Sequence, residues 1–221
     1  MSVLRAVLWD MDGTLLDSEK LWDVSLQEFA TKLGGVLSDG AREAMVGTSM
    51  AVSMDIFYAD LGLTGRDSAA DAAWLDVRTG ELFAEGLLWQ PGARELLLAV
   101  RRAGLRTALV TSTNRPLVED ALRSMGAEHF DAVVCGGETV AKPDAAPYRR
   151  ALSLLRLEPA EALVIEDSPT GVAAGVAAGC TVLAVPRAAP LPAQPGVVLR
   201  DTLAGVTVDD LREIWSAAPS P

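Results

Sequence analysis

A chain of 221 residues, half of them hydrophobic, is long enough to bury one large core or two smaller ones. Its 30 Asp and Glu outnumber its 19 Lys and Arg, and the resulting net charge of −11 opposes sequence-independent binding to nucleic acid or to an anionic membrane surface. Its apolar runs are short and broken by charges, and its N-terminus shows no signal-peptide pattern, so we expect a cytoplasmic globular protein.

The first predicted strand runs directly into a pair of carboxylates. Residues 3–9, "VLRAVLW", are mostly apolar and rich in residues that favour strands. Asp10 and Asp12 follow, then Gly13, and no Lys or Arg appears before Lys20. Whatever neutralises this carboxylate pair must therefore come from other parts of the fold.

The region that follows this strand has helical periodicity and no convincing strand. Trp22, Leu26, Phe29 and Leu33 recur at steps of three and four, and further helical stretches are predicted near 50–61 and 67–85. This pattern indicates a helical domain that is inserted into a larger α/β domain.

The predicted boundaries place residues 1–16 and 89–221 in the α/β core and residues 17–88 in a helical cap. The chain would cross between the two near 15–18 and again near 86–91. Two linkers that lie side by side form a natural hinge, which would let the cap close over a site on the core.

Strands and helices alternate through the rest of the chain. Apolar, β-rich runs lie at 105–111, 131–134, 161–166, 180–185 and 197–199. Amphipathic helical segments lie at 91–104, 116–125, 147–157, 169–178 and 207–215, with Pro91 expected in the first turn of the first of them. The alternation predicts an α/β fold, a doubly wound and mostly parallel Rossmann-like sheet with helices on both faces. Residues 187–196 are expected to form a surface loop.

Thiol and imidazole chemistry find little support in the sequence. Cys135 and Cys180 lie on or beside apolar runs without metal-ligand spacing, so we interpret them as buried, reduced thiols. His129, the single histidine, has no apparent partner for a catalytic pair. Any acid–base chemistry must therefore come from carboxylates.

Chemically reactive side chains follow four of the predicted strands. The four stretches contain Asp10 with Asp12, then Thr111, then Lys142, and finally Glu166 with Asp167. The carboxyl ends of parallel strands meet at one edge of a sheet, where ligands bind. Two carboxylates repel each other by about 1 kcal/mol at roughly 4 Å in water, and more in a drier site. A bound cation is therefore implied, and oxygen ligands favour Mg²⁺.

The other groups at this edge fit a phosphoryl centre. Gly13 allows backbone amides to face an anion, Thr111 supplies a hydroxyl and Lys142 supplies a positive charge. Asp10 can then act as a nucleophile, and Asp12 as the acid that protonates the leaving oxygen and the base that activates water.

Each of these positions also has a purely structural interpretation. Asp10 and Asp12 could form a strand-end turn, Thr111 could cap the next helix and Lys142 could be a solvated surface lysine. None of these alternatives explains why the four stretches converge, so we favour the catalytic interpretation.

Four motifs of the chain resemble those of a known family. "DMDGTLLDSE", "LVTSTN", "AKPDAAPY" and "VIEDSPTGVAAGVAAG" are similar, in this order, to the motifs of the haloacid dehalogenase superfamily of phosphatases and phosphomutases. The inserted helical segment resembles the branch that contains β-phosphoglucomutase and phosphoglycolate phosphatase. The resemblance covers essentially the whole chain and implies a Mg²⁺-dependent phosphoric monoester hydrolase that acts on a small phosphorylated metabolite.

The resemblance also implies roles for individual residues. Asp10 would be the nucleophile and Asp12 the general acid and base. The substrate phosphate would be bound by Thr111, Ser112 and Lys142. The Mg²⁺ ligands would be Asp10, the main-chain carbonyl of Asp12, Asp167, and Glu166 either directly or through water.

Two features of the motifs bear on this assignment. The family often has Lys-Pro-x-Pro-Asp in its third motif, whereas Ala145 and Ala146 occupy the last two of these positions here, which leaves the loop behind Lys142 less defined. Dehalogenases and phosphonatases of the superfamily lack a counterpart of Asp12, so its presence argues against both reactions.

Phosphatase and phosphomutase activity remain to be distinguished, and a catalytically silent binding protein is a third alternative. From Ser18 to Leu88 the insert has five Lys and Arg against twelve Asp and Glu, a net charge of −7 that would repel a second phosphate. The related mutases have His at the position of Trp22 and Arg at that of Met50, and only Arg78 could reach in as a substitute. We therefore predict hydrolysis of a substrate with one phosphate and a neutral or small polar body, by a monomer or weak homodimer.

Overall fold

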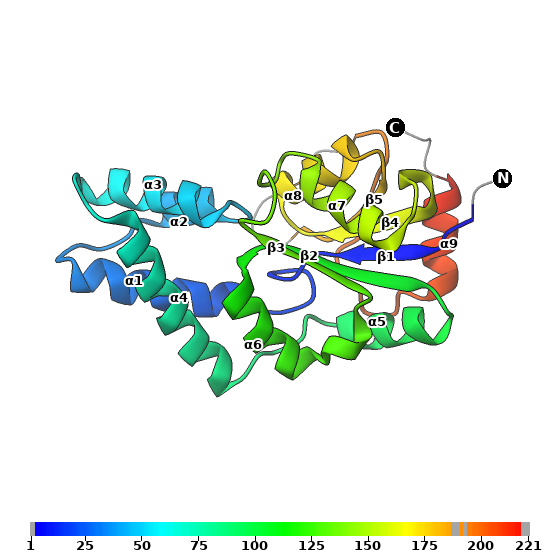
Figure 1. Cartoon of the computed structure of the whole chain (residues 1–221), viewed down its shortest axis with the longest axis horizontal. Helices are drawn as coiled ribbons and strands as arrows, with labels where there is room; N and C mark the ends of the chain where they lie inside the picture. Colours follow the sequence, from blue (N-terminus) through cyan, green and yellow to red (C-terminus); the bar gives the residue numbers. More distant parts are fainter. Residues whose placement is uncertain (1–2, 187–190, 192–193, 218–221) are drawn as a thin grey trace.

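A six-stranded parallel sheet forms the centre of the larger part of the molecule in the computed structural model, which describes residues 3–186, 191 and 194–217 (Figure 1). The strands are β1 (Ala6–Trp9), β2 (Arg106–Asn114), β3 (Ala132–Gly136), β4 (Ala162–Glu166), β5 (Thr181–Ala184) and β6 (Val197–Leu199), in the spatial order β3-β2-β1-β4-β5-β6. Ala6 of β1 lies between Arg106 of β2 and Ala162 of β4. The carboxyl ends of β2, β1 and β4 are therefore neighbours.

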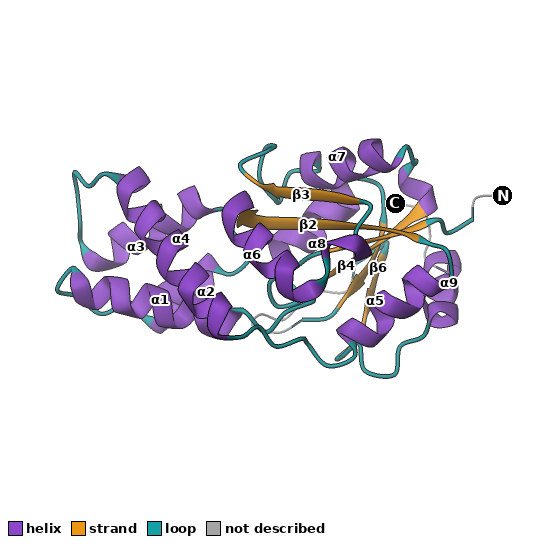
Figure 2. Ribbon diagram, turned by 60° about the horizontal axis from the view of Figure 1, so that its bottom comes forward, coloured by secondary structure: helices purple, strands orange, loops and turns teal. Residues whose placement is uncertain are grey.

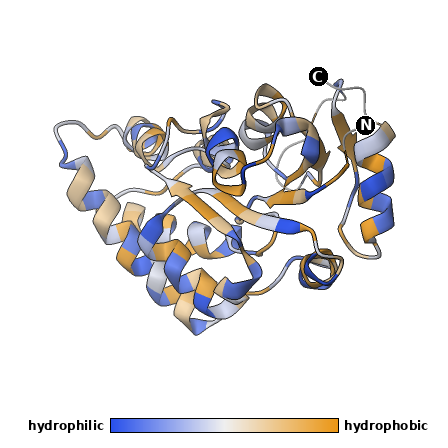
Figure 3. Cartoon of the chain, turned by 45° about the vertical axis from the view of Figure 1, so that its right-hand side comes forward, coloured by the Kyte–Doolittle hydropathy of each residue, from blue (hydrophilic) through white to orange (hydrophobic). Residues whose placement is uncertain are grey.

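Helices cover both faces of this sheet (Figure 2). One face packs against α5 (Ala93–Arg102), α6 (Arg115–Met125) and α9 (Val208–Ala217), and the other against α7 (Ala146–Leu155) and α8 (Pro169–Ala177). Successive residues of β1 point to opposite faces, and all four are fully buried. Burial on both faces explains why β1 and β4 are almost entirely hydrophobic, and the layered arrangement confirms the predicted α/β fold (Figure 3).

Four helices form the inserted part and lie together beside the sheet (Figure 1). They are α1 (Glu19–Lys32), α2 (Asp39–Met45), α3 (Met50–Leu61) and α4 (Ser68–Glu85). They bury a cluster of their own, in which Phe29 stacks on Phe57 and Trp74 at centroid distances of 5.3 and 4.9 Å. The periodicity predicts α1, α3 and α4 but misses α2, because a helix of seven residues with one buried side chain carries too little pattern to detect.

Two linkers join the helical insert to the sheet and are hydrogen-bonded to each other. Leu16 and Trp89 form an antiparallel bridge. The amide of Asp17 donates to the carbonyl of Leu88 and that of Gln90 to the carbonyl of Leu15, both at 2.8 Å. The two crossings therefore lie side by side.

One segment differs from the sequence-based prediction, and a second lies largely outside the residues that the structure describes. Pro91 does not lie in the first turn of α5, which begins at Ala93. Gly92 has a φ of +80° and packs against the backbone of Leu203, where a Cβ atom would lie 2.4 Å away, so this contact fixes a turn before the helix. The loop predicted over 187–196 lies largely outside the described residues.

Two further predictions concern cysteines and membrane segments. Cys135 and Cys180 are free, buried thiols, as predicted. None of the helices in the described part of the chain is long and apolar enough to cross a bilayer.

Candidate active site

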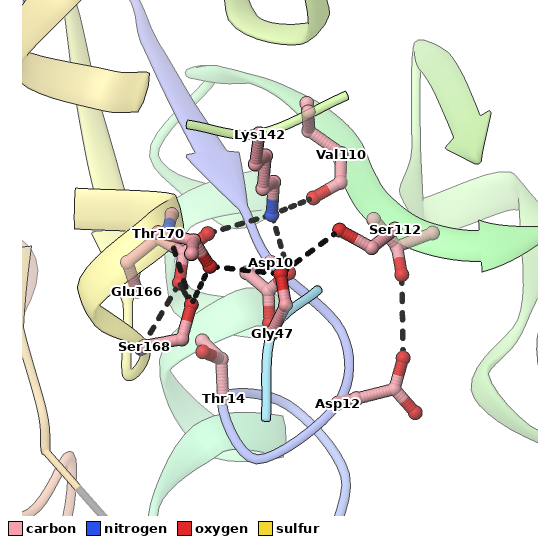
Figure 4. Close-up of polar contacts among 12 residues, drawn as sticks. Asp10, Asp12, Thr14, Gly47, Val110, Ser112, Lys142, Glu166, Ser168 and Thr170 are labelled. Carbon is pink, nitrogen blue, oxygen red and sulfur yellow. Dashed lines mark hydrogen bonds and ion pairs between the residues drawn. The ribbon is translucent and has the colours of Figure 1, made fainter. Parts of the chain in front are cut away.

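Side chains from two strand ends and one loop meet at the edge of the sheet (Figure 4). Asp10 directly follows β1, Glu166 ends β4, and Lys142 comes from the loop after β3. The Lys142 Nζ donates to Asp10 Oδ1 and Glu166 Oε1, both at 2.6 Å, and to the carbonyl of Val110 at 3.0 Å. The structure therefore brings these three sequence-predicted residues into direct contact in a buried ionic network.

Glu166 is held by protein donors on both of its carboxylate oxygens. Its Oε1 accepts from Lys142 and from the Tyr148 hydroxyl at 2.7 Å, while its Oε2 accepts from the amides of Asp167 and Ser168 at 3.1 and 3.3 Å. Gly171 packs so closely that a Cβ there would lie 1.7 Å from Glu166 Oε1. Glu166 thus positions Lys142 and the start of α8. Sequence analysis missed Tyr148, which reaches this carboxylate from α7.

The oxygens of Asp10, Glu166 and Asp167 lie close enough to share a cation, within 4.8 Å of one another. Burial raises the pKa of Asp10 to about 8, with Glu166 adding to the rise and Lys142 opposing it. Burial, and then the charges of Asp10 and Glu166, hold the pKa of Asp167 well above its usual value. One ammonium does not balance three buried carboxylates, so this donor set fits a hard divalent cation.

Two further observations fit a cation beside Asp10. Gly13 packs against Asp167, where a Cβ atom would lie 2.1 Å from Oδ2, and the Thr14 hydroxyl donates to Asp167 Oδ1 at 3.0 Å. No residue in the described ranges donates a hydrogen bond to the main-chain carbonyl of Asp12. That oxygen is therefore available as a ligand.

The carboxylate of Asp12 does not contact Lys142 and instead accepts four hydrogen bonds. Its Oδ1 accepts from the Ser18 hydroxyl at 2.6 Å and the Trp22 indole at 3.3 Å. Its Oδ2 accepts from the hydroxyls of Thr113 at 2.7 Å and Thr111 at 3.3 Å. Asp12 therefore joins the core strands to the first helix of the insert. Trp22 packs against the core cluster and also lines the cavity described next.

A cavity separates this edge of the sheet from the helical insert. Its empty volume is about 760 Å³, including space open to solvent. The core side is lined by Asp10, Asp12, Thr111, Ser112, Thr113, Asn114, Lys142, Asp167 and Ser168. The insert side is lined by Glu19, Trp22, Leu26, Arg42, Met45, Val46, Gly47, Thr48, Met50 and Ser53. All the predicted site residues except the fully buried Glu166 thus face one space.

A loop of the insert closes over the core at this cavity. The carbonyl of Gly47 accepts hydrogen bonds from the hydroxyls of Thr170 at 2.8 Å and Ser112 at 3.4 Å. Gly47 has a φ of +70°, and a Cβ atom there would lie 2.6 Å from Ser168. Only glycine therefore allows this close approach of the insert to the core.

The insert side of the cavity contains an ion-pair cluster that sequence analysis missed. Arg42 donates from Nη2 to Glu19 and from Nε to Asp23. Burial raises the pKa of Glu19 above its usual value although Arg42 opposes the rise. Arg78, the arginine that the sequence suggests as a substitute cation, pairs instead with Glu28 and Glu81 away from the cavity.

The loop behind Lys142, where the sequence departs from the family pattern, is held by a local hydrogen bond. Asp144 Oδ1 accepts a hydrogen bond from the Ala146 amide at 2.7 Å, where α7 begins. Lys142 reaches Asp10 and Glu166 with this loop in place.

Several known proteins are similar to this chain over most of its length. Residues 4–179 match the family model described as haloacid dehalogenase-like hydrolase. The chain is 32% identical to hexitol phosphatase A of Escherichia coli over 190 residues, which cover 85% of this chain and 86% of that protein. It is 33% identical to phosphoglycolate phosphatase of Rhodospirillum rubrum over 189 residues, 81% of this chain and 78% of the relative.

Solved structures show the same fold. CbbY from Rhodobacter sphaeroides in complex with phosphate superposes with a TM-score of 0.84 at 27% identity, covering 95% of this chain and 99% of that one. β-Phosphoglucomutase from Clostridium difficile superposes with a TM-score of 0.82 at 18% identity, covering 97% and 98% of the two chains. The second likeness concerns the fold alone.

Proposed function

Because the chain belongs to the haloacid dehalogenase-like hydrolases and is a phosphoric monoester hydrolase, we propose that it cleaves a small phosphorylated metabolite with Mg²⁺ and an aspartyl-phosphate intermediate. The observation that carries the proposal is the position of Asp10. It lies at the end of the central strand, 2.6 Å from the Lys142 ammonium, and shares a cation-sized space with Asp167. The hexitol and phosphoglycolate phosphatases among its relatives support a small-molecule substrate.

The proposed metal ligands are Asp10, Asp167 and the main-chain carbonyl of Asp12. Both carboxylate oxygens of Glu166 already accept hydrogen bonds, from Lys142, from Tyr148 and from the amides that follow Glu166. We therefore propose that Glu166 positions Lys142 and that any contact it makes with the metal is through water. When bound, Mg²⁺ would offset the charge of the carboxylates and of a substrate phosphate oxygen.

The proposed reaction has two steps. In the first, an oxygen of Asp10 attacks phosphorus, the bond from phosphorus to the leaving oxygen breaks, and Asp12 gives that oxygen a proton. In the second, the Asp12 carboxylate takes a proton from water, whose oxygen attacks phosphorus and restores Asp10 as inorganic phosphate leaves. Lys142, with the hydroxyls of Thr111 and Ser112, would hold the phosphate oxygens.

We also propose that residues 17–88 act as a cap on the core formed by 1–16 and 89–221. The insert buries its own cluster, its two linkers pair with each other, and its Gly47 loop touches the core above the site. A cap that closes over bound substrate excludes bulk water from the site while the phosphoryl group is transferred.

Hydrolysis is favoured over phosphomutase activity by the charges in the cavity. Within the described ranges, Lys142 and Arg42 are the cations that line it. Lys142 serves the phosphate at Asp10, and Arg42 is already paired with Glu19 and Asp23. A second phosphate would therefore find no unpaired cation.

The proposal is tested by phosphate release from a panel of hexitol phosphates, sugar phosphates, phosphoglycolate and nucleotides, with Mg²⁺ and with EDTA. We expect release from a subset of the panel with Mg²⁺ and loss of that release in EDTA. Equal rates in EDTA would exclude the metal, and no release from any compound would favour a catalytically silent protein.

A second assay addresses the mutase alternative. The enzyme is incubated with β-glucose 1-phosphate and catalytic β-glucose 1,6-bisphosphate, and the products are followed by phosphorus NMR. We expect inorganic phosphate to form faster than glucose 6-phosphate, and the reverse order would show a mutase.

A further inference from the structure

The insert side of the cavity contains a carboxylate with one oxygen that no donor among the described residues reaches. Glu19 lines the cavity, and its side chain is 23% exposed. Its Oε2 accepts from Arg42, whereas no residue in the described part of the chain donates to its Oε1. A half-buried carboxylate oxygen without a donor is a strong acceptor for a group that enters the cavity.

Arg42 offers a donor next to this acceptor. It is fixed at two points, by Glu19 through Nη2 and by Asp23 through Nε, and its Nη2 also reaches the carbonyl of Glu19 at 3.3 Å. No acceptor among the described residues bonds its Nη1. A hydroxyl group both donates and accepts, so one substrate hydroxyl, or two neighbouring ones, can satisfy Glu19 Oε1 and Arg42 Nη1 together.

The other residues on the insert side of the cavity offer few free polar groups, so Glu19 and Arg42 are the groups that can orient a polar substrate. Leu26, Met45, Val46 and Met50 make most of the insert side apolar. The other hydroxyls there, those of Thr48 and Ser53, already bond each other at 2.8 Å. Few polar groups in an otherwise apolar pocket are the ones that select a ligand.

The position of Glu19 relates it to the reacting end of the substrate. Burial is the main cause of the raised pKa of Glu19, and Asp12 is close enough for its charge to add to the rise. Asp12 is the group proposed to protonate the leaving oxygen. The hydroxyls that meet Glu19 therefore lie on carbons close to the phosphate ester.

The charge of the cluster limits what the substrate body can carry. Glu19 and Asp23 outnumber Arg42, so the cluster has a net charge of −1 and repels a second anion in the cavity. From these observations we propose that Glu19, held by Arg42, determines specificity for a polyhydroxy phosphomonoester without a second anionic group, an inference that rests on the proposed phosphatase function. Glu19 accepts a hydrogen bond from a substrate hydroxyl and disfavours substrates that carry a carboxylate or a second phosphate.

The test compares three substrates of three carbons with wild type and Glu19→Gln. Glycerol 3-phosphate has the hydroxyls, n-propyl phosphate lacks them, and 3-phosphoglycerate has a hydroxyl and a carboxylate. We expect Glu19→Gln to lower kcat/KM for glycerol 3-phosphate about tenfold, mainly by raising KM. The kcat/KM for n-propyl phosphate should change less than about threefold. The kcat/KM for 3-phosphoglycerate should rise, because the variant lacks the Glu19 charge that repels the substrate carboxylate.

Asp23→Asn is the matched control. Asp23 also pairs with Arg42, but its side chain is 51% exposed and does not line the cavity. This variant should leave the ratio of kcat/KM for glycerol 3-phosphate to that for n-propyl phosphate within about twofold of wild type. Equal losses of glycerol 3-phosphate and n-propyl phosphate turnover in Glu19→Gln, or the same loss of preference for glycerol 3-phosphate in Asp23→Asn, would overturn the assignment.

Calorimetric binding separates this inference from the proposed function. If wild type released no phosphate from the panel above or from these three compounds, the phosphatase proposal would fail, while binding would still decide the role of Glu19. Wild type should bind glycerol 3-phosphate more tightly than n-propyl phosphate, and Glu19→Gln should remove that difference. Equal binding of the two compounds by wild type would overturn the inference.

Discussion

The cavity has two walls, and they differ in how their polar groups are held. On the core wall, Lys142 is 6% exposed and Glu166, directly behind it, is 0% exposed, and each takes part in three or more hydrogen bonds. On the cap wall, the polar cluster of Glu19, Arg42 and Asp23 comes from two short stretches of helix and reaches solvent at Asp23. Most of the other cap-side groups are apolar.

This difference suits the core wall to catalysis and the cap wall to substrate selection. A group that attacks phosphorus needs a fixed geometry, which buried strand ends provide. A group that selects the substrate body can lie on the proposed cap, where exchange of a few side chains changes the fit without disturbing the core. Substitutions on the core wall should therefore abolish turnover, and those on the cap wall should change its selectivity.

The largest effect is expected for Asp10→Asn on the core wall. The amide is nearly isosteric but is a poor nucleophile and a weaker metal ligand, so kcat should fall about 10³-fold or more while the fold is kept. Asp17→Asn is the matched control, since Asp17 lies in the same segment and pairs with Lys20 at the surface. Steady-state rates and thermal melts of both variants test this. Activity of folded Asp10→Asn within tenfold of wild type would remove Asp10 from the nucleophilic role.

An intermediate effect is expected where the two walls touch. Gly47→Ala places a Cβ atom 2.6 Å from Ser168 and should hold the cap loop away from the core, which lowers kcat/KM about tenfold. Gly65→Ala provides the control: its φ of +68° gives similar backbone strain, but nothing lies within 4 Å of the added carbon. If both variants lost activity equally, strain alone would explain the loss and the contact would not matter.

The smallest effect is expected for Arg78→Ala. Arg78 lies on α4 and pairs with Glu28 and Glu81 away from the cavity, so its loss should leave kcat/KM within about twofold of wild type. Arg42→Ala, which removes a cavity-lining cation, should reduce kcat/KM for glycerol 3-phosphate more strongly. A large loss in Arg78→Ala, assayed on the same substrate, would mean that this arginine swings into the site during turnover.

The core wall could be predicted from the sequence, because parallel strands carry their carboxyl ends to one edge. The order of strands and motifs predicts that Asp10, Lys142 and Glu166 lie at this edge, and their side chains are in direct contact there. Thr113 was missed although a signal existed. It lies two residues after Thr111, and strand residues two apart point to the same side, but the sequence pattern ends β2 at 111 instead of Asn114.

The cap wall could not be predicted in the same way. Glu19 and Arg42 are 23 residues apart on different helices, and the helix that carries Arg42 was itself missed. Their contact depends on how α1 and α2 pack, which periodicity does not specify. Tyr148 illustrates the same limit on the core side, since its hydroxyl reaches Glu166 through tertiary packing alone.

Trapping the phosphorylated enzyme tests the central claim, that Asp10 receives the phosphoryl group, most directly. Asp12→Asn should slow the attack of water, and acetyl phosphate has a leaving group that needs no proton from Asp12. Acid-quenched Asp12→Asn enzyme should therefore show one added phosphoryl group on the peptide that contains Asp10, as measured by mass spectrometry, and the label should require Mg²⁺. A label on Thr111, Ser112 or another residue, or turnover without any labelled enzyme, would contradict the account.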